Sequence, residues 1–134
     1  MFGFGKKKTK KPKQESIEPE TAIITEEDKE EMLRTISMRE QELIQADEEE
    51  KAKIYEVIGM TYLKIGEDDQ AIDALEKSIQ HKKTLGDGYK SLLSLYNKKR
   101  AEAARMNDDK SLQVYLEKMD QMMQVSKDVT RGVR

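Results

Sequence analysis

The sequence predicts a small all-α protein, and three observations support this fold class. Apolar residues recur at the three- and four-residue spacing of helix faces from about residue 26 to residue 129, without the alternation typical of strands. The aromatic and aliphatic residues Tyr55, Ile58 and Tyr62 are followed by residues of the same kinds 34 positions later. Charged residues make up 39% of the 134-residue chain, which fits one small helical domain with solvated faces.

The organisation along the chain follows from composition. Residues 1–24 hold a basic and then an acidic segment with no usable apolar pattern, and we expect a disordered tail there. Residues 25–130 carry the helical periodicity and form the predicted domain, and residues 131–134 form a short tail.

The first predicted helix runs from about residue 26 to residue 46. Thr25 and Asp28 have the spacing of a capping box, and the acidic residues after Thr25 suit a helix N-terminus. Its apolar stripe is interrupted by polar residues 39–42. We therefore expect a capping helix that packs over only part of its length.

The next two helices are predicted over residues 51–64 and from the acidic residues 67–69 to about Ile79. Gly59 lies inside the apolar stripe of the earlier helix, where glycine costs up to about 1 kcal/mol relative to alanine. We expect it to allow close approach of a second backbone, with Ala71 packing into the space. Gly66 is the natural residue just past the helix end, where a left-handed conformation is needed.

A second, more divergent copy of this helix pair follows. Leu93 takes the place of Gly59, and Arg100 takes the place of the turn glycine, so the second turn is expected to depart from the first. The register returns about six residues late, and the intervening residues 98–106 are strong helix formers. We interpret the insertion as a lengthening of the helix by about 9 Å.

The last predicted helix, residues 109–129, has an apolar face rich in methionine. This face has two possible roles: it packs as core under the preceding helix, or it forms a dimer contact. Its residues are Leu112, Tyr115, Leu116, Met119, Met122 and Met123.

These residues together resemble a tetratricopeptide repeat, with one good copy at about residues 52–85 and one degenerate copy at about residues 86–125. The resemblance implies antiparallel helix hairpins with an extra N-terminal helix. It also implies a protein–protein interaction adaptor or scaffold that holds a peptide or partner protein. The family's groove positions fall on Lys53, Glu56, Met60, Leu63, Lys90, Ser94, Asn97 and Lys98.

The groove is mixed in chemistry. The family's clamp for a C-terminal carboxylate is expected to be absent, because Glu56 and Met60 stand where it needs lysine and asparagine. We expect Lys90, Asn97 and Lys98 to meet an acidic or polar segment. Two hairpins and one extra helix are fewer than the roughly three units that such folds need. The alternative function is therefore a structural subunit that self-associates as a homodimer.

Enzymatic function is not expected. His81 is the only histidine, it has no nucleophile in a recognisable motif, and we interpret it as an exposed residue at a helix end. The acidic clusters lack the ligand pattern of a calcium loop, so no metal site and no cofactor are predicted. The absence of cysteine, of a secretory signal and of a membrane span fits a cytoplasmic protein.

The N-terminal residues suggest an anionic membrane surface as a further partner. Residues 1–13 hold six lysines and no acid, whereas residues 14–50 hold fourteen acids and three bases. Aromatic rings at the headgroup level and lysines near anionic lipid act together in peripheral anchors. A solubilising tail, a contact with an acidic protein, and folding back onto the acidic helix are the alternatives, while nucleic acid is disfavoured by the neighbouring acids. The membrane-contact residues are Phe2, Phe4, Lys6, Lys7, Lys8, Lys10, Lys11 and Lys13.

Overall fold

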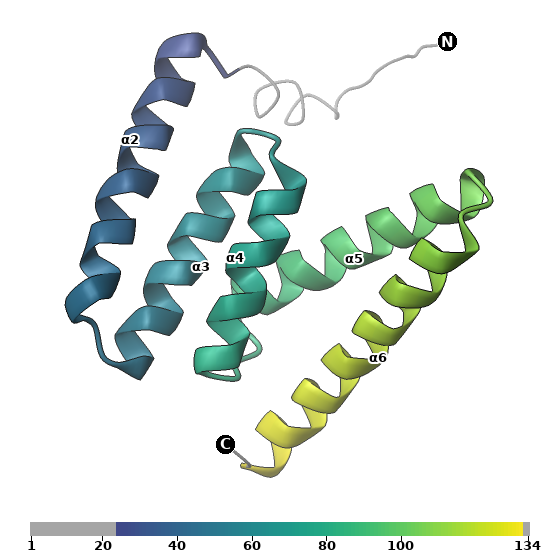
Figure 1. Ribbon diagram of the computed structural model, residues 1–134. Helices are drawn as coiled ribbons and strands as arrows, with labels where there is room; N and C mark the ends of the chain where they lie inside the picture. Colours follow the sequence, from purple (N-terminus) through teal and green to yellow (C-terminus); the bar gives the residue numbers. More distant parts are fainter. Residues whose placement is uncertain (1–23, 133–134) are drawn as a thin grey trace, which may run out of the picture.

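The computed structural model describes residues 24–132, and this part of the chain is all-α, as predicted (Figure 1). Of the predicted N-terminal tail, only Ile24 lies within the described residues. Five α-helices and one short 3-10 turn, η1, make up the described part. Their bounds are α2 Glu26–Glu42, η1 Leu43–Gln45, α3 Glu48–Lys64, α4 Asp68–His81, α5 Asp87–Arg105 and α6 Asp109–Arg131.

Helix α2 begins with the predicted capping box. The Asp28 amide donates to Thr25 Oγ1 over 3.0 Å, and the Asp28 carboxylate accepts from the Thr25 amide. Only Ile36 of this helix is fully buried, and it packs with Ile58 and Ala74. Partial packing of the first helix is thereby confirmed.

Helix α3 begins three residues earlier than the sequence analysis placed it. Asp47 caps the helix, since its carboxylate accepts from the Glu50 amide over 2.8 Å while Glu50 accepts from the Asp47 amide. This is a second capping box, and its spacing of three residues is visible in the sequence.

Gly59 allows the close approach of α4, as predicted, but its neighbour is not Ala71. A Cβ atom at Gly59 would lie 2.6 Å from Leu75 Cγ, which is closer than real contacts allow. Leu75 is fully buried, so its branched end cannot move aside. Ala71 is also buried but is not among the nearest neighbours of Gly59.

The turns after α3 and after α5 have the same hydrogen bonds. Gly66 has φ +81°, and the amides of Gly66 and Glu67 donate to the carbonyls of Leu63 and Tyr62. In the second turn Asn107 has φ 56°, and the amides of Asn107 and Asp108 donate to the carbonyls of Ala104 and Ala103. Both are Schellman motifs. The expected departure of the second turn was therefore wrong, because asparagine tolerates the left-handed conformation that glycine supplies in the first.

Helix α5 continues through residues 98–105, where the insertion was predicted to extend it. It is only two residues longer than α3, with 19 residues against 17. The net gain is about 3 Å rather than about 9 Å. The reason is a late start, because the chain leaves α4 in an extended conformation at Lys82 and the new helix begins only at Asp87.

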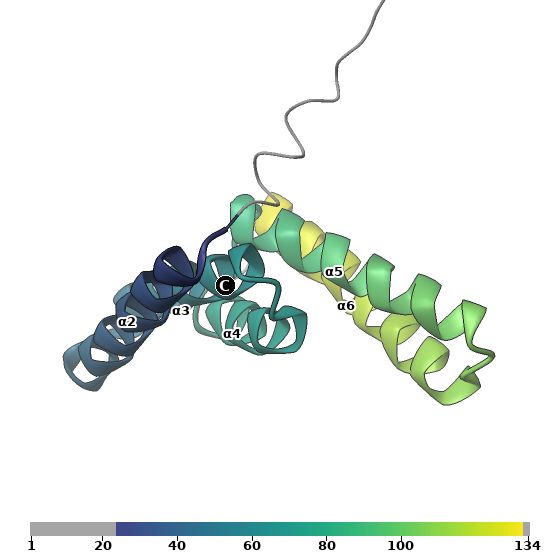
Figure 2. The same ribbon diagram turned by 90° about the horizontal axis from the view of Figure 1, so that it is seen from above.

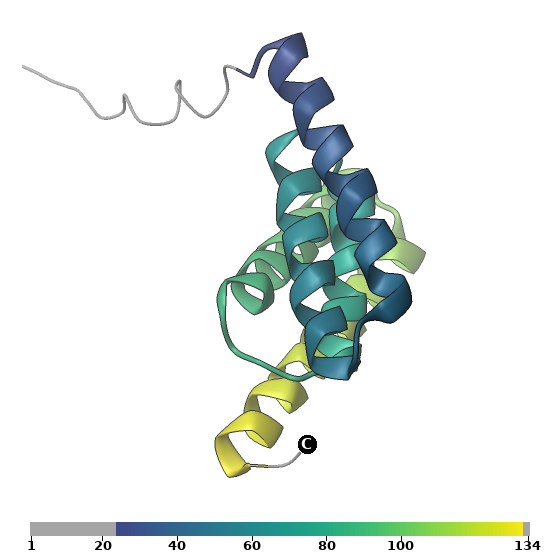
Figure 3. The same cartoon turned by 90° about the vertical axis from the view of Figure 1, so that its left-hand side faces the viewer.

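The helices form a layer and a projecting hairpin. Helices α2, α3 and α4 lie side by side, and the α5–α6 hairpin leaves this layer at an angle (Figure 2). Figure 3 shows α2 as the outer member of the layer. The main core cluster joins the two parts through Leu75 of α4, Leu92 and Tyr96 of α5, and Met122 of α6. None of the described helices is long and apolar enough to cross a membrane.

Candidate partner-binding surface

The predicted groove residues lie on α3 and α5, and these two helices meet where α5 begins. The Gly88 amide at the start of α5 donates to Glu56 Oε2 in the middle of α3 over 2.8 Å. Ten residues later, Lys98 Nζ lies 2.6 Å from Asp68 Oδ2, where α4 begins after the end of α3. Helix α5 therefore begins beside the middle of α3, and further along it contacts the start of α4 as it leaves the layer of α2, α3 and α4 (Figure 2).

Glu56 has a structural role at the boundary between the two hairpins. Gly88 is buried, and a Cβ atom there would lie 2.7 Å from Glu56 Oε2. Glycine at this position leaves room for the carboxylate, which then accepts the free amide in the first turn of α5. The sequence analysis placed Glu56 in the groove but had no signal for this contact.

Three other predicted groove residues also have partners inside the protein. Met60 and Leu63 are half-buried and pack against the main core cluster. Asn97 Oδ1 accepts from the Arg100 guanidinium over 3.0 and 3.1 Å. These three side chains therefore help to form the floor or the wall of the surface.

The exposed positions of the predicted groove are Lys53, Lys90, Ser94, Asn97 and Lys98. Neither Lys53 nor Lys90 forms an ion pair within residues 24–132, whereas Lys98 is paired with Asp68. The predicted groove positions thus include two exposed lysines without an ion pair, an exposed serine, and two half-buried apolar residues, Met60 and Leu63.

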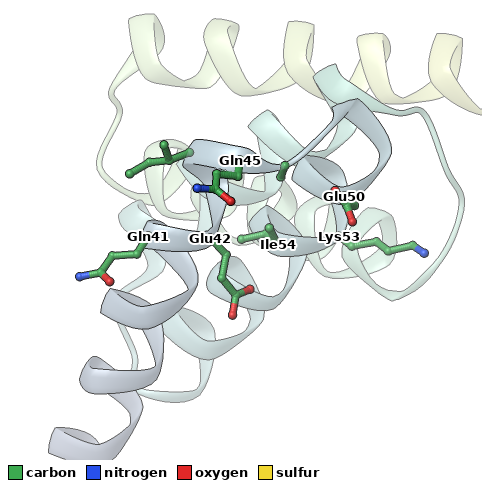
Figure 4. A pocket seen from close by; sticks show the side chains of 8 residues that line it. Gln41, Glu42, Gln45, Glu50, Lys53 and Ile54 are labelled. Carbon is green, nitrogen blue, oxygen red and sulfur yellow. The ribbon is translucent and has the colours of Figure 1, made fainter.

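A surface hollow adjoins Lys53 at the junction of α2 and α3 (Figure 4). In Figure 4 the side chains of Gln41 and Lys53 point to opposite sides, with Ile54 between them. Ligand sites need polar groups that converge on one point, and these do not. The hollow is lined by Gln41, Glu42, Ile44, Gln45, Ala46, Glu50, Lys53 and Ile54.

A polar network on the other side of the molecule joins three helices. The Tyr96 hydroxyl donates to Glu76, and Lys118 Nζ lies 2.8 Å from Glu76 Oε2 and 5.7 Å from the centre of the Tyr96 ring. Burial first, and then the hydrogen bond to Glu76, raise the pKa of Tyr96 far above its usual range. The phenol therefore stays neutral and acts as a donor, and the network ties α4, α5 and α6 together.

His81 is not the exposed helix-end residue that the sequence analysis expected. Its ring stacks on Tyr55 with centroids 5.5 Å apart, and Nδ1 lies 2.7 Å from Glu48 Oε2. The side chain is 26% exposed. The antiparallel hairpin brings the end of α4 beside the start of α3, so Tyr55 and Glu48 of α3 lie next to the His81 ring.

The described residues hold no cluster suited to a metal ion. Between residues 24 and 132 there is no group of three His, Asp or Glu side chains placed to bind a metal ion. Comparisons with known proteins identify no relative, since no family model, curated protein or solved structure matches the chain. Functional conclusions therefore rest on the surfaces of the two hairpins.

Proposed function

We propose that this chain is an adaptor that binds a peptide or partner protein along the surface formed by α3 and α5. The observation that supports this most is the repeated architecture. Two hairpins with the same Schellman turn follow each other, and the Glu56–Gly88 contact joins their first helices, α3 and α5. In tetratricopeptide-like proteins this arrangement presents the first helices to a partner.

The chemistry of the surface favours an acidic or polar partner segment. Lys53 and Lys90 are exposed and have no ion-pair partner among the described side chains. Ser94, one turn after Lys90, adds a hydroxyl that donates or accepts. Lysine ammonium groups on flexible stems attract carboxylates without demanding one geometry. The half-buried Met60 and Leu63 offer apolar contact beneath them.

A peptide-display selection against the full chain tests the proposal. We expect selected peptides to be enriched in Asp and Glu. Their affinity should fall at least about tenfold when Lys53→Glu and Lys90→Glu are combined, because two attractive contacts become repulsive. Lys98 is left unchanged in this variant, since its reversal would also break the ion pair with Asp68.

Lys110→Glu is the control for each groove substitution made singly, because it changes the net charge by the same amount. Lys110 is exposed at the start of α6, away from the α3–α5 surface, and the change alters the charge in the same direction. Equal loss of binding in the control and in either single groove variant would assign the effect to net charge. Unchanged binding in the double groove variant would reject the surface.

The proposal includes a peripheral membrane tether, which rests on residues 1–13 and lies outside the described residues. Liposome co-sedimentation of the full chain and of a chain lacking residues 1–13 tests this part. We expect salt-sensitive binding to anionic vesicles that vanishes with the deletion, at about 1 kcal/mol per lysine near the surface. Equal sedimentation of both chains would remove the tether and leave the adaptor proposal untouched.

A further inference from the structure

Helix α6 is attached to the rest of the protein on one side. Lys118 Nζ lies 2.8 Å from Glu76 of α4, and Asp128 Oδ2 lies 2.8 Å from Lys83 in the linker. At 3.6 residues per turn, Leu116 and Met123 project about 120° to 160° away from these two side chains. They are 46% and 58% exposed. The helix therefore has an apolar side that faces away from the first hairpin.

We name this side the outer strip, and it consists of Leu112, Leu116, Met119 and Met123. The four residues have the spacing of one helix face. Leu112 and Met119 lie 40 residues after Ile72 and Ile79, which pack in the core cluster shared with α5 and α6. The first hairpin uses these positions to stack on the second. In α6, Leu112 is half-buried and Met119 is half-buried against the main core cluster, whereas Leu116 and Met123 of the same strip are exposed.

We propose that the outer strip binds the outer strip of a second copy of this chain, with the two α6 helices antiparallel. The charges beside the strip favour this occupant. Asp109 and Lys127 are both exposed and are separated by 18 residues, which is about five full turns, so they lie on the same line of the helix. Neither forms an ion pair within residues 24–132.

An antiparallel pair brings these opposite charges together twice. If the two-fold axis passes near residue 118, Asp109 of each copy lies opposite Lys127 of the other, and residue 118 is close to the middle of the strip. Parallel helices in register would instead oppose like charges. An anionic lipid surface is disfavoured as an occupant, because Asp109 and Asp120 are exposed near the strip.

The size of the strip predicts a reversible dimer. Its four residues span eleven positions, a length of about 16 Å. A contact of this length buries less than the roughly 1,200 to 2,000 Å² of total surface that stable interfaces bury. Self-association does not rest on the adaptor proposal, but it would present two α3–α5 surfaces in one particle and raise avidity for a partner with two binding segments.

Sedimentation equilibrium of the full chain tests the proposal over a concentration range of about 5 to 500 µM, where weak interfaces of this size associate. We expect the average mass to rise from the 15.5 kDa of the monomer toward twice that value. Leu116→Glu should weaken association at least about tenfold, because it buries a charge in the strip. A chain that stays monomeric throughout the range would overturn the proposal.

Val114→Glu is the matched control for the strip. Val114 is 44% exposed on the same helix and projects about 160° away from Leu116, so the change is equal in charge and exposure. We expect this variant to associate like the parent chain. Equal weakening by both substitutions would overturn the assignment to the outer strip. Circular dichroism of both variants verifies that the helices are retained.

A charge swap tests the antiparallel register. Lys127→Glu places a carboxylate opposite Asp109 of the second copy and should weaken association several-fold. Adding Asp109→Lys to the same chain restores two opposite-charge pairs and should recover most of the loss. Failure of the double variant to recover, with its helix content intact, would overturn the antiparallel arrangement.

Discussion

The two hairpins share one turn geometry, but their second helices, α4 and α6, differ in how much of them is buried. In α4 the buried residues include Ala71, Ile72, Ala74, Leu75 and Ser78, whereas only Met122 is buried in α6. The first hairpin lies between α2 and the second hairpin, while the second has a neighbour on one side only (Figure 2). The comparison shows that the shape of each unit is set locally, whereas its burial depends on its neighbours.

The largest expected effect comes from truncating the buried leucine that fills the first hairpin. Leu75→Ala should lower the free energy of unfolding by about 2 to 5 kcal/mol, because the side chain is 0% exposed and leaves a cavity. Tyr115→Ala, at the corresponding place 40 residues later, should cost about 1 to 2 kcal/mol, since that ring is only half-buried. Urea denaturation at low temperature measures both. Equal losses would contradict the difference between the hairpins.

A second prediction concerns the close approach of α3 and α4. Gly59→Ala should destabilise the protein by about 1 to 2 kcal/mol, because overpacking against Leu75 outweighs the helix propensity gained. In a Leu75→Ala background the same change should cost much less, since the branched side chain is gone and only the backbone nitrogen of residue 75, at 3.2 Å, stays close. The difference is read from a double-mutant cycle of urea midpoints. A loss of the same size in both backgrounds would mean that Leu75 is not the obstacle.

These contacts also show what the sequence allowed us to predict. Gly66 and the capping box at Thr25 each involve only a few neighbouring residues at the end of a helix. The local sequence was therefore sufficient to predict them. The contact between Gly88 and Glu56 joins residues 32 positions apart, and glycine in the first turn of a helix carries no local signal for it. The partial burial of His81 at the end of α4 was missed for the same reason, since its partners belong to α3.

The second turn was missed for a different reason. A fixed spacing of 34 residues from Gly66 leads to Arg100, whereas the left-handed residue is Asn107. The available signal was an Asn-Asp pair after a run of helix formers. Asparagine is second only to glycine in how readily it adopts the left-handed conformation.

A third prediction exchanges the residues of the two turns. Gly66→Ala should cost about 1 kcal/mol, because a Cβ atom is strained at φ +81°. Asn107→Gly should change stability by less than about 0.5 kcal/mol, since either residue fits there. Urea midpoints of the two variants, with Gly86→Ala as a control at a glycine of negative φ, separate strain from chain entropy. A costly Asn107→Gly would show that the asparagine side chain has another role.

The smallest expected effect is the pH dependence of the link between the hairpins. The ion pair with Lys83, followed by the Gln124 hydrogen bond, lowers the pKa of Asp128 below its ordinary 3.8. A lowered pKa in the folded state contributes stability above the ordinary value, and this contribution is lost as the pH falls through the lowered pKa. Asp128→Asn should therefore lower the urea midpoint at neutral pH and leave it unchanged in strong acid.

Asp73→Asn is the control for this prediction. Asp73 pairs with Lys77 within α4, so its loss does not affect the link between the hairpins. The two variants should differ at neutral pH and converge in acid. Identical profiles would indicate that the Lys83–Asp128 pair is not a significant link.

Native-state hydrogen exchange resolved by residue tests the central contrast between the two hairpins most directly. Amides of α3 and α4 should exchange only through global unfolding, because neighbours cover them on both sides. Amides of α6 before Lys118, beyond its ion pair with Glu76, should exchange through local opening at a lower free energy. Protection in that part of α6 equal to or greater than that in α4, at a protein concentration low enough to keep the chain monomeric, would contradict the account.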